Sequence, residues 1–293
     1  MPVTVDKPEQ LESWDLVLHP RTRWFDLHLG DLLRYRDLIW LFVKRDFITF
    51  YKQTILGPLW YILQPLLTTV VFTVIFGKFG KIPTDGIPRF IFYLSGTVTW
   101  SYFANCLSQT SNTFIKNAGV FGKVYFPRLS VPISVVIINL AKFSIQFIVF
   151  LTFYTYSIVK GASIRPGLFI LLLPVLVFQM ALLSFGTGIL VSSLTTKYRD
   201  LNFVMTFAVQ LWMYGSSVII PASVVAEKVS TRWLYVYMLN PMVSIVEMFR
   251  YAFFGEGLVK PVFIAMGWCV TLLVLFAGVT LFGRIEKNFM DTI

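Results

Sequence analysis

The sequence predicts an all-α membrane protein with six transmembrane helices, an N-terminal amphipathic helix and short re-entrant outer helices before the last span. The first observation behind this prediction is composition. Of the 293 residues, 56% are hydrophobic and only 14% are charged, whereas soluble domains average about a quarter charged residues. The second is the recurrence of long apolar runs, since roughly 20 apolar helical residues are needed to cross a bilayer core.

The first element is a polar N-terminal segment, residues 1–30. It contains acidic residues and lacks the apolar stretch of a signal peptide, so we expect it to stay in the cytosol.

Residues 31–56 have the pattern of an amphipathic helix. At 100° per residue the basic residues Arg34, Arg45 and Lys52 fall on one side, and apolar residues fall on the other. This pattern is typical of a helix that lies along a membrane surface. It fits a plain anchor or a docking helix that offers its polar side to a cytosolic partner.

Gly57 and Pro58 predict a corner between this helix and the first span. Gly57 gives the backbone freedom to turn, and Pro58 suits a first helical turn because its missing N–H would be unpaired there. Gln64 and Pro65 fall one to two turns into the span. Both residues would suit a helix that faces a partner or a pathway better than one that faces lipid.

The six predicted spans form one transmembrane domain, residues 57–283, which is followed by a cytosolic tail, residues 284–293. The 25 Lys and Arg residues are concentrated in the segments that lie in the cytosol if both termini are inside. We therefore expect a multi-pass protein with cytosolic N- and C-termini. The predicted spans cover residues 59–77, 90–110, 131–158, 168–194, 201–220 and 261–283.

The segment 221–256 is apolar but is interrupted at Asn240 and Pro241. We expect two short helices here that dip into the outer leaflet, since irregular backbone at membrane depth needs protein or a wet cavity around it. Glu247 and Arg250 are three residues apart and are expected to pair. The pair fits structural charge neutralisation or a ligand site.

The sequence lacks several catalytic patterns. No GxxxxGK[ST] loop, HExxH, GxSxG or paired-Cys motif occurs. The six predicted spans contain no Asp or Glu, although ion-coupled carriers usually keep an intramembrane carboxylate. We therefore expect no catalytic residue, metal or cofactor in this chain, and any uphill transport would take its energy from a partner.

Two sets of residues in the spans could line a pathway. Asn139, Lys142 and Gln146 share one helix face, which fits a polar stripe or a lysine that reaches toward the cytosol beside two amides packed between helices. Aromatic residues of the first two spans could form an interfacial belt or bind sugar rings. These aromatic residues are Trp60, Tyr61, Trp100, Tyr102 and Phe103.

Four motifs give the chain a family resemblance. They are RDFITFYKQTILGPLWYILQPLLTTVVFTVIFG (45–77), KVYFPRLSVPIS (123–134), KYRDLNFVM (197–205) and LNPMVSIVEMFRYA (239–252). In this order they resemble the membrane-spanning permease subunits of type-2 ABC transporters that export polysaccharides or polyol phosphates. The resemblance covers residues 31–293.

The resemblance implies a homodimer in the inner membrane of a bacterium, with two ATP-binding cassette ATPase subunits on its cytosolic face. ATP and Mg would be bound by those subunits. The substrate would be a lipid-linked glycan such as O-antigen, capsular polysaccharide or teichoic acid. Membrane lipids are further partners, and nucleic acid is not expected.

The resemblance also implies roles for individual residues. The amphipathic helix becomes an interface helix that contacts the ATPase, and the segment 221–256 becomes a pair of outer gate helices. The ATPase-coupling residues would be Arg34, Arg45, Lys52, Lys123, Tyr125, Phe126, Arg128, Tyr198, Arg199 and Asp200. The outer gate would include Asn240, Pro241, Glu247 and Arg250. The substrate pathway would include Trp60, Tyr61, Gln64, Trp100, Tyr102, Phe103, Asn139, Lys142 and Gln146.

Three alternatives remain open from the sequence. One is a drug or small-lipid exporter of the same architecture. Another is a membrane-embedded glycosyltransferase or acyltransferase, which would need an Asp, Glu or His constellation that the spans do not offer. The third is a scaffold without a transport role.

Overall fold

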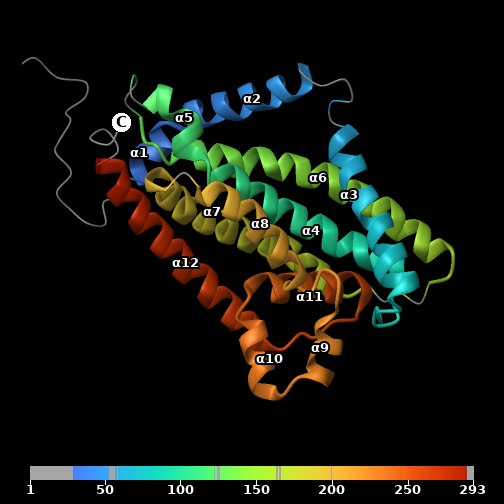
Figure 1. Cartoon of the computed structure of the whole chain (residues 1–293). Coiled ribbons are helices and arrows are strands. Elements are labelled where there is room, and N and C mark those ends of the chain that lie inside the picture. The colour runs from blue at the N-terminus through green and yellow to red at the C-terminus, as the bar shows by residue number, and fades with distance from the viewer. Residues whose placement is uncertain are drawn as a thin grey trace, which may run out of the picture.

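The computed structural model describes residues 29–52, 57, 59–121, 123, 126–162, 164, 166–198 and 200–288, and within these ranges the chain forms helices and no strand (Figure 1). Residues 1–28 of the predicted N-terminal segment and residues 289–293 of the predicted tail lie outside the described ranges. The helices are α1 (Leu29–Arg34), α2 (Arg36–Lys52), α3 (Leu59–Phe72), the π-helix η1 (Thr73–Phe79), α4 (Arg89–Thr110), α5 (Thr113–Phe121), α6 (Ser130–Val159), the 3-10 helix η2 (Leu168–Leu172), α7 (Leu173–Lys197), α8 (Leu201–Tyr214), α9 (Ala222–Lys228), α10 (Thr231–Met238), α11 (Pro241–Phe254) and α12 (Pro261–Asn288).

The predicted amphipathic helix is two helices, α1 and α2, separated by a turn at Tyr35. α2 packs against α6, and its residues Phe42 and Val43 are buried. The corner that follows is at Gly57, whose φ of 47° lies in the left-handed region. There glycine has no steric penalty, and the Gly57 carbonyl accepts a hydrogen bond from the Trp60 N–H at 3.3 Å as the next helix begins.

Five of the six predicted spans coincide with helices along their length, whereas the fifth, 201–220, is helical only as far as Tyr214. Four of these helices are long and apolar enough to cross a membrane: Leu59–Phe79, Ser130–Val159, Leu168–Thr196 and Pro261–Ile285. α8 has 14 residues, about 21 Å at 1.5 Å per residue, which is shorter than a bilayer core of about 30 Å. The chain is therefore a multi-pass helical protein, and the six-span count stays a prediction.

α4 is more polar than the other long helices because it is surrounded by protein. It contacts α3, α6, α7, α8 and α11, and most of its residues are buried. Ser95 and Thr97 donate their hydroxyl hydrogens to backbone carbonyls of α4 itself, at 2.7 and 2.6 Å. Hydroxyls satisfied in this way can be buried at low cost.

α7 and α12 pack closely because glycines remove side chains at the crossing. A Cβ added at Gly186 would lie 2.7 Å from the Leu275 Cα, and one added at Gly278 would lie 2.3 Å from the Gly186 carbonyl oxygen. Small residues allow membrane helices to approach backbone to backbone. Figure 1 shows α12 running from the neighbourhood of α10 to that of α1 along this contact.

The segment 221–256 contains three helices, not the two short helices that the sequence predicts. Extended backbone at Val229 and Ser230 separates α9 from α10, and Asn240 and Pro241 start α11. Every residue of α11 except Tyr251 is buried. α11 is therefore a central helix of this end of the molecule, with α9 and α10 outside it (Figure 1).

Candidate functional site

The predicted pathway residues of α3 lie at its start, where Trp60 is 47% exposed and Gln64, one turn later, is also exposed. Tyr61 is half-buried, and its ring centroid is 5.1 Å from the Lys142 Nζ of α6. An ammonium over an aromatic face is a cation–π contact. The structure thus brings Tyr61 and Lys142 together between α3 and α6 and leaves Trp60 and Gln64 exposed on α3.

The predicted pathway residues of α4 lie elsewhere, in the interior. Trp100, Tyr102 and Phe103 are all buried. The Trp100 and Phe103 rings pack against Trp212 of α8 at centroid distances of 6.5 and 5.1 Å, and Tyr102 packs against Phe143 of α6 at 5.4 Å. These rings contribute to the core in this arrangement, and their role in a pathway stays a prediction.

The amides of α6 pack between helices. The Asn139 Nδ2 donates to the Gln109 Oε1 of α4 at 3.1 Å and to the Val135 carbonyl at 2.8 Å. Gln146 is also buried. Asn139 therefore contacts α4, while Lys142 lies beside Tyr61 of α3. Whether this helix face lines a pathway stays a prediction.

The predicted coupling residues that the structure describes belong to several segments, namely α1, α2, the segment between α5 and α6, and the segment between α7 and α8. Figure 1 shows α1, α2 and α5 at one side of the molecule. Arg34 and Lys123 are exposed. The Arg45 Nε donates to the neighbouring Asp46 carboxylate at 2.7 Å, and its Cζ lies 5.0 Å from the Phe42 ring centroid. Tyr125, Arg199 and the side chain of Lys52 lie outside the part of the chain that the structure describes.

Phe126, which the resemblance implies is a coupling residue, joins several of these elements through ring contacts. It is buried and packs against Phe42 of α2 at 5.7 Å and Phe121 of α5 at 5.6 Å. Phe121 continues to Phe114 at 5.9 Å, and Phe114 stacks on Phe282 of α12 at 4.6 Å. We call these five phenylalanines the aromatic chain; it fixes α2 and α5 to α12.

The remaining coupling residues are Arg128, beside the aromatic chain, and Tyr198 and Asp200, between α7 and α8. The Arg128 Cζ lies 5.7 Å from the Phe121 ring centroid, beside the aromatic chain. Tyr198 is 52% exposed, and the exposed Asp200 immediately precedes α8. A carboxylate at a helix N-terminus interacts favourably with the helix dipole.

The sequence analysis did not identify the other four members of the aromatic chain, because nothing in the sequence distinguishes these residues among 29 phenylalanines.

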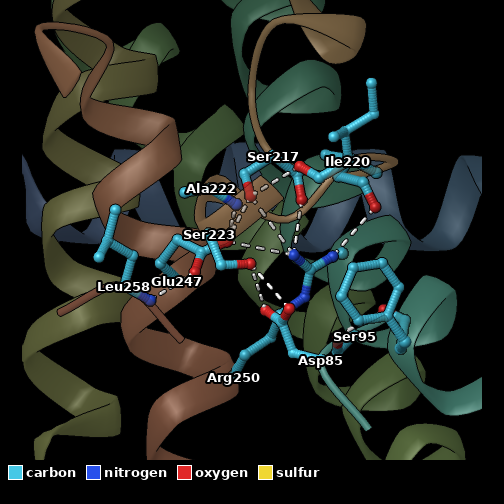
Figure 2. A network of polar contacts seen from close by, with 12 residues as sticks. Asp85, Ser95, Ser217, Ile220, Ala222, Ser223, Glu247, Arg250 and Leu258 are labelled. Atoms are coloured by element: carbon cyan, nitrogen blue, oxygen red, sulfur yellow. Dashed lines mark hydrogen bonds and ion pairs between the residues drawn. The ribbon is translucent and has the colours of Figure 1, made fainter. Parts of the chain in front are cut away.

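The opposite end contains a buried ion pair, as the spacing of Glu247 and Arg250 predicts. The Arg250 Nη1 lies 3.4 Å from the Glu247 Oε1, and both side chains are 1% exposed (Figure 2). A buried charge is tolerated only with close partners. The predicted pairing is confirmed.

Glu247 accepts hydrogen bonds from two loops besides its contact with Arg250. Its Oε1 accepts from the Ser217 hydroxyl and from the Ala222 N–H at 3.1 Å, and its Oε2 accepts from the Leu258 N–H at 2.8 Å. Ser217 has a positive φ of 57°. One carboxylate of α11 thus holds the segment before α9 and the segment after α11 (Figure 2).

Arg250 holds the same segment through its guanidinium. Nη1 donates to the Ser217 carbonyl at 2.7 Å and Nη2 donates to the Val218 carbonyl at 3.0 Å. The guanidinium lies 3.6 Å from the Phe92 ring centroid. Gly96 of α4 leaves the necessary room, since a Cβ there would lie 3.0 Å from Nη2.

Asn240 adds a third attachment. Its Nδ2 donates to the Gly215 carbonyl at 2.8 Å and to the Ser216 hydroxyl at 2.9 Å, while its Oδ1 accepts from the Met242 N–H at 3.1 Å. Pro241 occupies the first turn of α11, where its lack of an N–H has no cost. We call Asn240, Glu247 and Arg250 with the partners named here the outer clamp.

The outer clamp contains groups that the sequence did not single out. Ser217, Ala222 and Leu258 meet Glu247 only through the fold, and their roles depend mainly on backbone groups or a small hydroxyl, which carry no sequence signal. Among the residues that the structure describes, no group of three or more His, Cys, Asp or Glu could hold a metal ion.

Comparisons with known proteins agree with this architecture. The profile of the family described as "ABC-2 type transporter" matches residues 37–254, which run from the second residue of α2 to the end of α11. The chain is 25% identical over 257 residues to the O-antigen export system permease protein RfbA of Klebsiella pneumoniae, covering 87% of this chain and 94% of that protein.

Two further relatives match over similar lengths. The O-antigen export system permease protein RfbA of Myxococcus xanthus is 25% identical over 266 residues, 90% of this chain and 98% of that protein. The capsule polysaccharide export inner-membrane protein CtrC of Neisseria meningitidis is 22% identical over 266 residues, 89% of this chain and 95% of that protein. Because the family profile covers most of the chain, this protein belongs to the ABC-2 type transporter family.

Proposed function

We propose that this chain is the permease subunit of an ATP-driven exporter that moves lipid-linked polysaccharide across the cytoplasmic membrane. The observation that carries the proposal is similarity along nearly the whole chain to permeases named for O-antigen export and to an inner-membrane protein named for capsule polysaccharide export. The four motifs that suggested the family lie, in order, within residues 37–254 that the family profile matches.

The proposed assembly is a homodimer with two ATPase subunits, which bind ATP and Mg. The ATPases dock on the end that carries the exposed Arg34, Lys123 and Tyr198. Support comes from the aromatic chain: rings in van der Waals contact transmit displacement because packed interiors compress little. A force applied to α2 or α5 therefore reaches α12. Both termini lie in the cytosol in this arrangement.

The proposed substrate pathway begins at the exposed face of α3, with Trp60 and Gln64. Aromatic faces suit the apolar faces of sugar rings, and an amide can donate to and accept from sugar hydroxyls. Lys142 lies beside Tyr61 at the same helix contact.

A drug or small-lipid exporter of the same family is the competing proposal. It shares the architecture, and the relatives' names favour the polysaccharide exporter. A membrane-embedded glycosyltransferase or acyltransferase would need a catalytic constellation. Among the described residues, the buried Glu247 is already occupied by an arginine, a hydroxyl and two backbone amides.

The test is purification of the tagged chain from its own host in mild detergent. We expect an ATP-hydrolysing subunit to co-purify, and its ATP hydrolysis to respond to lipid-linked glycan from that host more than to the lipid carrier without glycan. A preparation that contains no ATPase subunit, or whose hydrolysis responds only to small amphiphiles, would contradict the proposal.

A further inference from the structure

The outer end of the molecule has two kinds of attachment, which differ in how easily they can be broken. The Glu247–Arg250 pair at the centre of the outer clamp is buried, so opening it would leave a carboxylate, a guanidinium and several backbone groups without partners. Unpaired buried charges are strongly unfavourable. We expect the clamp to keep α11 and the segment before α9 together in every state of the protein.

The second attachment joins the loop after η1 to the start of α9. Both oxygens of the Asp85 carboxylate accept from the Ser223 hydroxyl, at 2.7 and 2.9 Å (Figure 2). Asp85 and Ser223 are each partly exposed. Since water can replace the partners of partly exposed groups, this contact can open at far lower cost than the buried Glu247–Arg250 pair.

The loop that carries Asp85 is shaped around this contact. Lys81 and Asp85 both have positive φ angles of 49°, and Gly86 follows at 76°. Non-glycine residues rarely adopt this conformation, and tertiary contacts must hold them there. The Thr84 hydroxyl donates to the Ile87 carbonyl at 2.7 Å and supports the turn.

The helix that leads into this loop is the most weakly held of the four long apolar helices. Leu59–Phe79 is the least buried of them. It contains Pro65 and ends in the π-helix η1, and a proline or a π-helical segment is a common site of bending.

Charged groups around Asp85 make its contact with Ser223 responsive to its surroundings. Burial raises the pKa of the Asp85 carboxyl, the Ser223 hydrogen bond offsets part of this, and the field of Glu247 and Glu227 raises it while Arg250 lowers it. Asp85 therefore lies within the electrostatic field of the outer clamp without being one of its hydrogen-bonded members.

We propose that Asp85 and Ser223 form a releasable latch between the outer end of the first span and the clamped core, closed at rest and open during transport. The outer clamp stays closed throughout. This inference rests on the proposed export function. It assigns the movable boundary of the outer end to the α3–η1 helix and its loop, and not to the Glu247–Arg250 pair.

The experiment is a reversible cross-link between Asp85→Cys and Ser223→Cys in a chain in which Cys106 and Cys269 are replaced by alanine. Export is measured in vesicles after oxidation and again after reduction. Because a covalent link removes the open state, we expect export to fall about tenfold or more on oxidation and to return on reduction. Each single-cysteine variant, oxidised in the same way, controls for damage by the oxidant.

A second pair tests the clamp. Ser216→Cys with Asn240→Cys should form a link that leaves export the same after oxidation as after reduction. Equal export by the linked and reduced forms of the Asp85–Ser223 pair would overturn the latch, and so would failure of that pair to link in resting vesicles. Absence of ATP-dependent export by the unmodified complex would instead count against the proposed function.

The rate of cross-linking gives a readout that does not depend on glycan. With the partner ATPase present, we expect ATP to slow disulfide formation between Asp85→Cys and Ser223→Cys and to leave the rate at Ser216→Cys and Asn240→Cys unchanged. An ATP effect on the second pair alone would place the moving boundary in the clamp and refute the latch.

Discussion

The two members of the buried ion pair should differ in how much stability they provide. Glu247 accepts from the Ser217 hydroxyl, from the Ala222 and Leu258 N–H groups and from Arg250. Glu247→Met would remove the acceptor that all of these donors share. One of them, the Arg250 guanidinium, already has an Nε without a hydrogen-bond partner in the described structure. Removing one partner of a buried pair costs about 3–5 kcal/mol.

Arg250→Met should be milder. It would leave the Ser217 and Val218 carbonyls without a donor, but Glu247 would keep three hydrogen bonds. Because unpaired buried donors cost about 1–3 kcal/mol each, we expect Glu247→Met to destabilise the chain by at least about 1–3 kcal/mol more than Arg250→Met. The double substitution removes both charges and should cost less than the sum of the two single ones.

The assay is unfolding of the purified chain in detergent, followed by the fluorescence of its tryptophans, for both single variants, the double variant and Ser244→Ala. Ser244 is a neighbour in α11 whose hydroxyl donates to the Pro241 carbonyl of the same helix at 3.0 Å, so its loss should have a small effect. Greater destabilisation by Arg250→Met than by Glu247→Met, or strictly additive effects, would refute the reasoning.

Three further predictions follow from the packing and from Asp85. Gly278→Ala puts a Cβ 2.3 Å from the Gly186 carbonyl oxygen and should lower the free energy of unfolding by about 1–3 kcal/mol. At Gly283 a Cβ would have no neighbour within 4 Å, so Gly283→Ala should be nearly neutral in the same unfolding experiment. Phe126→Ala removes a buried ring that joins α2 to α5 and should cost about 3–5 kcal/mol while lowering the glycan exported per ATP hydrolysed; unchanged coupling would contradict the role of the aromatic chain. Burial raises the pKa of Asp85, so its ionised form is disfavoured in the folded state. The wild type should therefore gain stability relative to Asp85→Asn as the pH falls through the raised folded-state pKa toward the pKa of the unfolded chain. Melting temperatures of the two proteins at pH 8 and pH 5 would disprove this if the difference between them changed in the opposite sense.

The positions of the helices could be predicted from the sequence, because length and hydropathy determine which segments cross a bilayer. Five of the six predicted runs are helical along their length and the fifth is helical over 201–214, and the corner at Gly57 follows from a residue that tolerates a positive φ. The Glu247–Arg250 pair was also predictable, since residues three apart on a helix are neighbours. The number of outer helices was not, because the extended Val229 and Ser230 have no strong breaker signal.

The surroundings of each helix could not be predicted, because lipid and protein interior are both apolar and periodicity does not separate them. Trp100 and Phe103 fit an interfacial belt, a pathway or a core equally well in sequence, and the fold places them in the core. For the same reason, the sequence did not show that α11 is buried on all sides. Contacts between distant segments, such as Asp85 with Ser223, need the tertiary structure.

The most direct test of the account is export by the reconstituted complex of this chain with its ATPase subunit. Lipid-linked polysaccharide is supplied on the face of the vesicle that ATP reaches, and its appearance on the other face is measured with a glycan-binding protein that cannot cross the membrane. We predict transfer that requires ATP, Mg and both subunits. ATP-dependent movement of small amphiphiles without any movement of glycan would contradict it.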